Sequence, residues 1–155
     1  MRQLFIWFGH TPVGLYMRDS TNGFAAVETV HLLGLAVLGG VVLLLSLGAL
    51  QVAVAARTPG ATAQSLLPVF TTALAIMLAS GVLLTASKPL RYFLSAPFRW
   101  KIALLAAGVA LYLYLGRRLT GRGDGAVTET DQALAILLLL LWFGVGLAGR
   151  LIGLL

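Results

Sequence analysis

The sequence contains no cysteine and few charged residues. Without cysteine, disulfides, thiolate metal sites, iron–sulfur ligation and Cys-anchored c-type haem are excluded. Only 10% of the 155 residues are charged and 59% are hydrophobic, whereas soluble domains average about 25% charged residues. Such a chain lacks the polar surface that would cover a water-soluble core. These deficits exclude a soluble enzyme domain, a disordered tail and a fibrous repeat, and they make lipid the natural solvent.

Four long segments carry no charged residue at all. They comprise residues 29–56, 58–87, 102–116 and 132–149, with lengths of 28, 30, 15 and 18 residues. A membrane-spanning helix needs about 20 mostly apolar residues. The sequence therefore predicts an all-α fold, an integral membrane four-helix bundle forming a single transmembrane domain over residues 1–155. We expect an interfacial segment at 1–18 and spans at about 24–56, 66–86, 98–116 and 133–155.

The net charge of +6 does not indicate nucleic-acid binding, because the basic residues lie in short loops beside apolar segments and form no stripe. The expected partner of these loops is the lipid bilayer. With four spans, the N-terminus, the second loop and the C-terminus share one side, which holds seven of the 11 basic residues. The positive-inside rule then favours a cytoplasmic N-terminus.

Connectivity also predicts that one membrane face collects nearly all the unusual polar groups of the spans. That face receives the start of spans 1 and 3 and the end of spans 2 and 4. Its members are Glu28, His31, Lys88, Arg91, Trp100, Lys101 and Arg150. The opposite halves of the helices are almost plain hydrocarbon.

His31 is the main candidate for a functional residue. It lies about 10 Å inside the first span, at a rise of 1.5 Å per residue, where an ionisable side chain is costly. A neutral imidazole could ligate haem iron or another metal, or relay a proton. Gly34, one turn further on, would let a flat macrocycle approach the backbone. The alternative is a structural histidine, hydrogen-bonded to a neighbouring helix or to headgroup water.

The other polar groups of this face admit two interpretations each. Glu28 suits the start of a helix dipole, or it orients His31 or pairs with Arg150. Arg150 and Lys101 snorkel to the interface, or they bind a carboxylate of a cofactor. The candidate cofactor-binding set is His31, Glu28, Lys101, Arg150, Lys88 and Arg91, and the candidate metal ligands are His31 and His10.

Several short motifs resemble an uncharacterised family of small four-span bacterial membrane proteins. They are Glu28-Thr-Val-His31-Leu-Leu-Gly34, Ser80-Gly81-Val-Leu-Leu, Tyr92-Phe-Leu-Ser-Ala-Pro-Phe98-Arg-Trp-Lys101 with Leu104-Leu-Ala-Ala-Gly108, and Ala148-Gly-Arg150. The resemblance covers roughly residues 15–155 and implies a multi-pass protein of the bacterial inner membrane. Relatives carry basic residues after span 1, which implies an outward N-terminus. We follow the resemblance here and expect the N-terminus outside.

More distantly, the pattern is similar to the copper-resistance protein D family and to the haem-containing bacterial protoporphyrinogen oxidases. The second similarity implies a b-type haem, with His31 and Lys101 at the positions of an axial histidine and a site lysine. Relatives of the small family often end span 3 with a histidine, where this chain has Leu115. A bis-histidine haem would then have to use His10. Otherwise the haem is five-coordinate, shared between protomers, or absent.

The sequence is compatible with three functions, and it does not decide whether the protein is an enzyme. The first is electron transfer or oxidoreduction with haem b. The second is a non-catalytic small subunit that packs against other membrane subunits, or against itself, through Gly149 and Gly153. The third is copper handling. Hydrolysis finds no support in the sequence, because two histidines and isolated hydroxyls form no nucleophile–base–orienter set.

Overall fold

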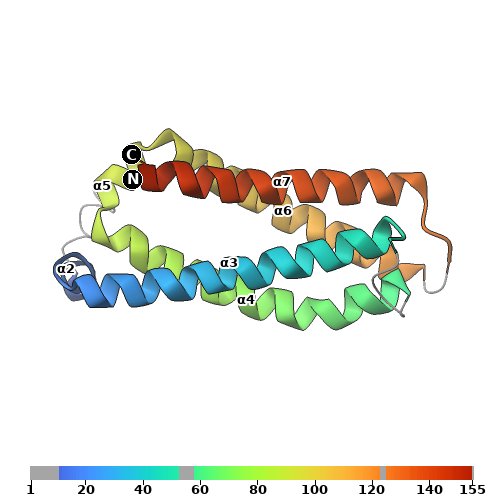
Figure 1. Cartoon of the computed structure of the whole chain (residues 1–155), viewed down its shortest axis with the longest axis horizontal. Coiled ribbons are helices and arrows are strands. Elements are labelled where there is room, and N and C mark those ends of the chain that lie inside the picture. Colours follow the sequence, from blue (N-terminus) through green and yellow to red (C-terminus); the bar gives the residue numbers. More distant parts are fainter. Residues whose placement is uncertain (1–10, 53–57, 123–124, 155) are drawn as a thin grey trace.

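The computed structural model describes residues 11–52, 58–122 and 125–154, and this part of the chain is almost entirely helical. It contains six helices and no strand, as Figure 1 shows. They are α2 (Pro12–Asp19), α3 (Thr21–Ala49), α4 (Pro59–Ser87), α5 (Pro89–Leu94), α6 (Ala96–Gly121) and α7 (Glu129–Leu154). The all-α prediction is confirmed.

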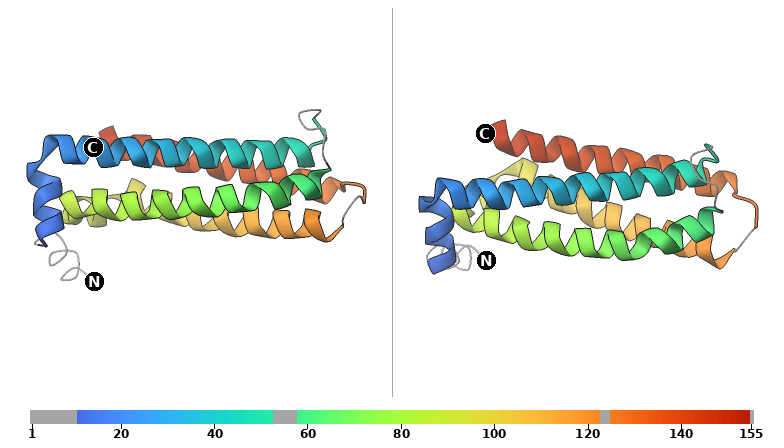
Figure 2. Two further views of the ribbon diagram at one scale, coloured as in Figure 1. Left: turned by 90° about the horizontal axis from the view of Figure 1, so that it is seen from below. Right: turned by 60° about the horizontal axis from the view of Figure 1, so that its bottom comes forward.

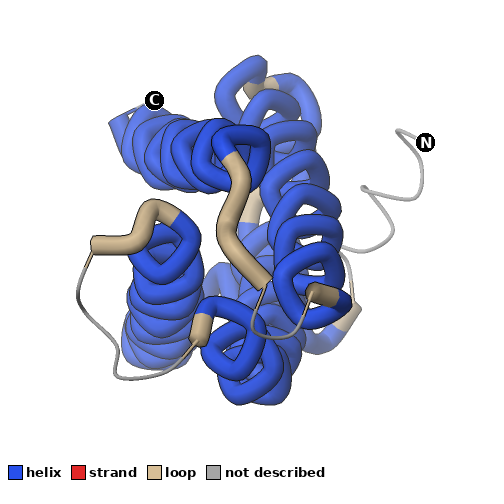
Figure 3. The backbone as a smooth tube through the Cα atoms, turned by 90° about the vertical axis from the view of Figure 1, so that its right-hand side faces the viewer, coloured by secondary structure: helices blue, strands red, loops and turns tan. Residues whose placement is uncertain are grey.

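Four of these helices, α3, α4, α6 and α7, are long and apolar enough to cross a membrane. They form a bundle in which α3 packs against α4 and α7, and α6 packs against the same two helices (Figures 1 and 3). Helices α3 and α6 begin at the end of the bundle where α2 lies, and α4 and α7 finish there. We call this the α2 end, and we call the other the opposite end.

Large apolar side chains cover the outside of the bundle. Leu33, Leu140 and Phe143 are 62%, 64% and 75% exposed. A water-soluble protein rarely presents such a surface over its whole length, but lipid tails solvate it without cost. The structure therefore has the architecture of a multi-pass membrane protein.

Hydroxyl side chains fix where the helices begin. Thr11, Ser20, Thr58 and Ser95 each accept a hydrogen bond from the backbone N–H three residues later. These caps satisfy N–H groups that have no partner within the helix. Pro59 follows directly at the first helical position of α4, where its missing N–H costs nothing.

The cap at Thr58 corrects the predicted start of the second span. Helix α4 begins at Pro59 and not near residue 66. Pro68 consequently lies inside the helix instead of in its first turn. A proline there removes one backbone hydrogen bond and favours a bend, and the ribbon of α4 curves along its length (Figure 1).

Other boundaries also differ from the expected ones. Helix α3 ends at Ala49, before the predicted limit at residue 56. Helices α6 and α7 extend into the polar stretch predicted as a loop over residues 117–131, because α6 runs to Gly121 and α7 starts at Glu129. Of the expected interfacial segment at 1–18, residues 12–18 belong to α2. His10 lies outside the described residues.

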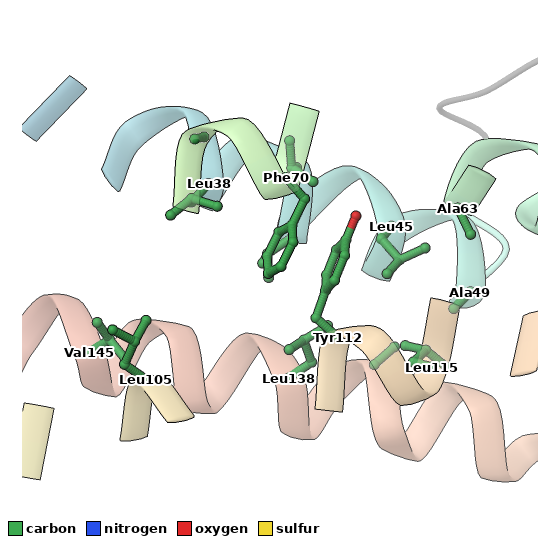
Figure 4. Close-up of a cluster of buried hydrophobic side chains, with 14 of the residues drawn as sticks. Leu38, Leu45, Ala49, Ala63, Phe70, Leu105, Tyr112, Leu115, Leu138 and Val145 are labelled. Carbon is green, nitrogen blue, oxygen red and sulfur yellow. The ribbon is translucent and has the colours of Figure 1, made fainter. Parts of the chain in front are cut away.

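The core follows a seven-residue repeat on each helix. Leu38 and Leu45 of α3 are fully buried, as are Leu115 of α6 and Leu138 of α7. Such a repeat keeps one stripe of each helix turned to its neighbours. Near the middle, Phe70 and Tyr112 stack with ring centroids 3.7 Å apart (Figure 4). The stack joins α4 to α6 across the interior.

A buried carboxylate closes the α6–α7 hairpin at the opposite end. Asp131 is fully buried and accepts hydrogen bonds from the guanidinium groups of Arg118 and Arg122. The N–H and hydroxyl of Thr128 donate to the same carboxylate, and the N–H of Asp131 donates back to the Thr128 hydroxyl. This is a capping box with aspartate in the place of glutamate. Asp131 thus starts α7 and ties it to α6 with two ion pairs.

We expect replacement of Asp131 by alanine to destabilise the bundle by about 2–4 kcal/mol, since it leaves two arginines without their partner and removes the cap. The measurement is chemical or thermal unfolding in detergent. Glu129→Ala is the matched control, because Glu129 is an exposed acid in the same first turn, and its loss is expected to cost less than about 1 kcal/mol. Equal effects of the two substitutions would contradict the structural role of Asp131.

Tyr112→Phe is expected to leave the protein as stable as before, or to stabilise it by about 1 kcal/mol. The Tyr112 hydroxyl is buried, and no hydrogen-bond partner is found for it in the described part of the chain. Phenylalanine keeps the stack with Phe70 and removes the unpaired group. Tyr112→Ala, in contrast, is expected to cost about 3–5 kcal/mol. A clear loss of melting temperature in Tyr112→Phe would reveal a partner for the hydroxyl.

Candidate functional site

At the α2 end, the interior stripe of the bundle changes from apolar to polar. His31 lies seven residues before Leu38 and so occupies the same face of α3 as the buried Leu38 and Leu45. Lys101 lies seven residues before Gly108, and Gly108 lies seven before Leu115, on the buried face of α6. Both ionisable side chains are partly buried. The helix positions therefore turn His31 and Lys101 toward the interior.

Helix α4 holds the His31 ring. The Nδ1 atom of His31 lies 3.1 Å from the Met77 carbonyl oxygen and 3.0 Å from the Ser80 hydroxyl oxygen. A carbonyl oxygen only accepts hydrogen bonds, so Nδ1 must carry the hydrogen. In the neutral ring, Nε2 is then the nitrogen with the free lone pair.

The Ser80 hydroxyl fits the same assignment. Its own hydrogen goes to backbone carbonyls of α4, at 2.7 Å from the Ile76 oxygen and 3.1 Å from the Met77 oxygen. The Ser80 oxygen is therefore free to accept from Nδ1 of His31. Gly81 completes the seat, because a Cβ atom there would lie 3.2 Å from Cε1 of the His31 ring. The Met77 carbonyl, the Ser80 hydroxyl and Gly81, all on α4, thus set the orientation of the imidazole, and we call these three the seat of His31.

Lys101 reaches across the interior from α6 to α7. A Cβ atom placed on Gly149 would lie 3.4 Å from Nζ and 3.6 Å from Cε of Lys101. The lysine stem therefore lies over the bare backbone of Gly149, and its ammonium interacts electrostatically with the His31 ring. Within residues 11–52, 58–122 and 125–154, Lys101 has no hydrogen bond or ion pair. A partly buried cation without a counter-charge marks a place for an anionic group.

The contact of Gly149 with Lys101 changes the interpretation of the Gly149/Gly153 pair. We predicted a surface for self-association or for other membrane subunits. The structure instead turns Gly149 toward α6 within the same chain, while a Cβ on Gly153 would meet nothing within 4 Å. Gly149 therefore packs against Lys101 within the chain, while association through the Gly149/Gly153 pair stays a prediction.

The remaining candidates of this end lie on the outer surface. Glu28, Lys88, Arg91 and Arg150 are all exposed. Glu28 is not the group that orients His31, since Met77 and Ser80 fill that role. Nor does Glu28 form an ion pair with Arg150 in the described structure. The assignment of these four residues to a cofactor stays a prediction.

Glu28 and Arg91 both influence the Tyr92 side chain of α5. Burial raises the pKa of the Tyr92 phenol above its ordinary value, while the positive charge of Arg91 and a hydrogen bond with Ser87 lower it and the negative charge of Glu28 raises it. Glu28 therefore lies near the α5 connector, which also carries Arg91.

Two predicted features of the His31 site are corrected by its geometry. Gly34 does not offer an open backbone, because a Cβ there would lie 3.5 Å from Met77 Cβ and 3.7 Å from the Ala73 carbonyl oxygen of α4. Leu115 lies 14 residues beyond Lys101, or about 21 Å along α6, and is fully buried. A histidine at position 115 would therefore not face His31 across one haem.

No group of three or more His, Cys, Asp or Glu side chains that could hold a metal ion is found among the described residues. His31 is the only histidine that the structure describes, since His10 is outside the described residues. Copper handling and ligation by His10 stay predictions. The described residues therefore give His31 no complete set of protein ligands for a metal ion.

Sequence reasoning missed the residues that hold His31 and the cluster at the opposite end. Ser80 was part of a motif, but its contact with His31 spans 49 positions of the chain and has no local signal. Asp131, in contrast, had one: Thr128-x-x-Asp131 before an apolar run is the signature of a capping box. The opposite end is therefore not plain hydrocarbon.

Comparison with known proteins gives one family. A model described as "Family of unknown function (DUF6644)" matches residues 4–155. No curated protein and no solved structure matches the chain. The match agrees with the resemblance to an uncharacterised family, and the distant similarity to the copper-resistance protein D family and to haem oxidases stays a prediction.

The tautomer of His31 is directly measurable. In protein labelled with ¹⁵N-histidine, we expect the neutral His31 ring to carry its hydrogen on Nδ1, with His10→Gln used for assignment. Gly81→Ala places a methyl group against the ring and is expected to shift its resonances. Gly149→Ala is the control, because its methyl group meets only the flexible end of Lys101. A ring protonated on Nε2 alone would contradict the proposed seat on α4.

Proposed function

The chain belongs to a family whose function is unknown, and we propose that it binds a b-type haem at the α2 end of the bundle and acts in electron transfer or oxidoreduction. In this proposal, Nε2 of His31 would hold the haem iron and Lys101 would bind a haem propionate. The bound haem would supply reversible one-electron chemistry at its iron.

The observation that carries the proposal is the hydrogen bonding of His31. A histidine that ligates a metal almost always donates its second N–H to a carboxylate, a backbone carbonyl or water, which fixes the ring and makes the ligating nitrogen more basic. His31 donates in this way to the Met77 carbonyl and Ser80. A ring held only for packing has no need to keep Nε2 unpaired, and no hydrogen bond to this atom is found within the described structure.

Lys101 supports the same ligand class. A cation held inside a bundle is costly unless an anion accompanies it. The described part of the chain provides no carboxylate for Lys101, and in this proposal the anion comes with the ligand. A haem propionate is such an anion, and an ammonium–carboxylate pair is a strong, charge-assisted contact.

The packing around the two side chains suits a redox site. Leu38 and Leu105 lie one to two helical turns deeper in the core and are buried, so water is excluded from that side. At the α2 end, the partial exposure of His31 and Lys101 leaves the site open toward the membrane interface. Electrons could then be exchanged at one membrane face, with the apolar core beneath as an insulator.

The experiment is an optical spectrum of the full chain purified from cells supplied with haem. We expect a Soret band and a positive pyridine haemochrome assay, and we expect His31→Ala to lose both. His10→Ala is the matched control and keeps the band if His31 is the single protein ligand. Lys101→Gln is expected to weaken haem binding about tenfold, which corresponds to the loss of one charge-assisted bond.

Melting of each variant without haem checks that the fold persists. A chain that carries no haem under these conditions, or a His31→Ala variant that keeps its Soret band, would overturn the proposal. Loss of the band in His10→Ala as well would change the site from one protein ligand to two.

A further inference from the structure

We propose that the α2 end of the bundle faces the cytoplasm and that its exposed basic and aromatic side chains bind the headgroups of anionic phospholipids. This surface comprises Lys88, Arg91, Arg99 and Arg150 with Tyr16 and Trp100. It is separate from the interior pair His31 and Lys101. The inference does not depend on haem binding.

The first support is the state of the charges at the two ends. Lys88, Arg91, Arg99 and Arg150 are exposed, and within the described ranges none of them forms an ion pair. At the opposite end, Arg118 and Arg122 are both paired with the buried Asp131. There, only Arg117 and Glu129 remain as exposed charges without an ion pair in the described structure, and they are of opposite sign. The α2 end also carries the exposed acids Asp19 and Glu28, but its exposed basic residues outnumber them, so the excess of positive charge lies at the α2 end.

The second support is the helix α2, which lies across the end of the bundle instead of along its axis (Figure 2). Met17 is buried on one side of α2, while Val13 and Tyr16 on other faces are 48% and 61% exposed. A short helix that crosses a membrane bundle at its end lies in the plane of the interface. Its exposed apolar side chains then reach the boundary between headgroups and lipid tails.

The third support is the position of an aromatic residue beside the basic ones. Trp100 is 67% exposed in the first turns of α6, next to the exposed Arg99. Tryptophan and tyrosine rings favour the headgroup level. Basic side chains beside them meet the lipid phosphates, and each such residue is attracted by the negative surface potential of the cytoplasmic leaflet.

This placement reverses the orientation expected from the resemblance. The expectation of an outward N-terminus assumes that the clustered basic residues serve a cofactor or a partner and not orientation. Among the described residues, the structure leaves five of them on the exposed surface (Arg18, Lys88, Arg91, Arg99 and Arg150) and only Lys101 in the interior. The positive-inside rule therefore applies to these five, and it places the α2 end inside.

Orientation is tested by single-cysteine labelling, which the cysteine-free sequence makes clean. Ala96 at the α2 end and Ala126 at the opposite end are both exposed, so Ala96→Cys and Ala126→Cys form a matched pair of small substitutions. In intact cells, a membrane-impermeant maleimide is expected to label the Ala126→Cys variant at once and the Ala96→Cys variant only after permeabilisation. The reverse pattern would overturn the proposal.

Lipid binding is tested by the melting temperature of the full chain in a neutral detergent with added phospholipid. Phosphatidylglycerol is expected to raise the melting temperature, phosphatidylcholine to do so much less, and 0.5 M salt to remove most of the difference. The Lys88→Gln/Arg91→Gln/Arg99→Gln/Arg150→Gln variant is expected to lose at least half of the phosphatidylglycerol effect. Arg117→Gln, an exposed arginine at the opposite end, is expected to keep it.

Equal stabilisation of the unmodified chain by the two lipids would overturn the headgroup site, and so would a full phosphatidylglycerol effect in the fourfold variant. If the fourfold variant does not fold, the lipid and salt comparison on the unmodified chain still decides. A haem-free protein with the expected lipid response would separate this surface from the haem proposal.

Discussion

In a bundle surrounded by lipid, a polar side chain at an interior position is costly unless the protein or a bound ligand supplies its partner, because little water is there to do so. This constraint organises both ends of the structure. On α7, the interior stripe that contains Leu138 and Val145 starts with Asp131, whose carboxylate is satisfied by two arginines and by Thr128. On α3, the stripe that contains Leu38 and Leu45 starts with His31, whose Nδ1–H is satisfied by α4. Between the two ends, the interior is hydrocarbon with few exceptions.

The two ends differ in how completely their interior polar groups are paired. At the opposite end, every charge on the interior side has a partner from the same hairpin, so the cluster is a structural closure that needs no ligand. At the α2 end, one half of the imidazole is satisfied and the other half is not, and the Lys101 ammonium has no counter-charge in the described structure. Stability alone would favour an apolar pair at these positions. The incomplete end, and not the number of polar groups, is what distinguishes a candidate site from a structural cluster.

Much of this arrangement follows from local sequence rules, and the rest depends on contacts between distant segments. Charge-free runs gave the four long helices, and connectivity placed His31, Lys88, Lys101 and Arg150 at one end. The start of α4 at Pro59 could also be predicted from the sequence, since Thr58-Pro59 combines a cap with a proline at the first helical position. The seat of His31 was not, because Ser80 lies 49 residues away and its contact depends on how closely α3 and α4 approach at Gly34. The sequence also does not show which basic residues turn inward. Lys101 faces the interior while its neighbours Arg99 and Trp100 are exposed, and this difference depends on how α6 is rotated against the other helices.

Glycine residues on neighbouring helices allow Lys101 and His31 to lie inside the bundle. Lysine is long enough to snorkel out of the bundle, and at the first turns of α6 the interface is close. The stem of Lys101 nevertheless lies over Gly149, where a methyl group would be in ordinary van der Waals contact with the stem and a longer side chain would compete with it for space. The ring of His31 lies over Gly81 in the same way, on the other pair of helices. Two glycines on α4 and α7 thus make room for two ionisable side chains from α3 and α6. Hydrophobic packing alone would fill these positions with leucine or alanine, so the vacated space is an argument for a site that is independent of charge.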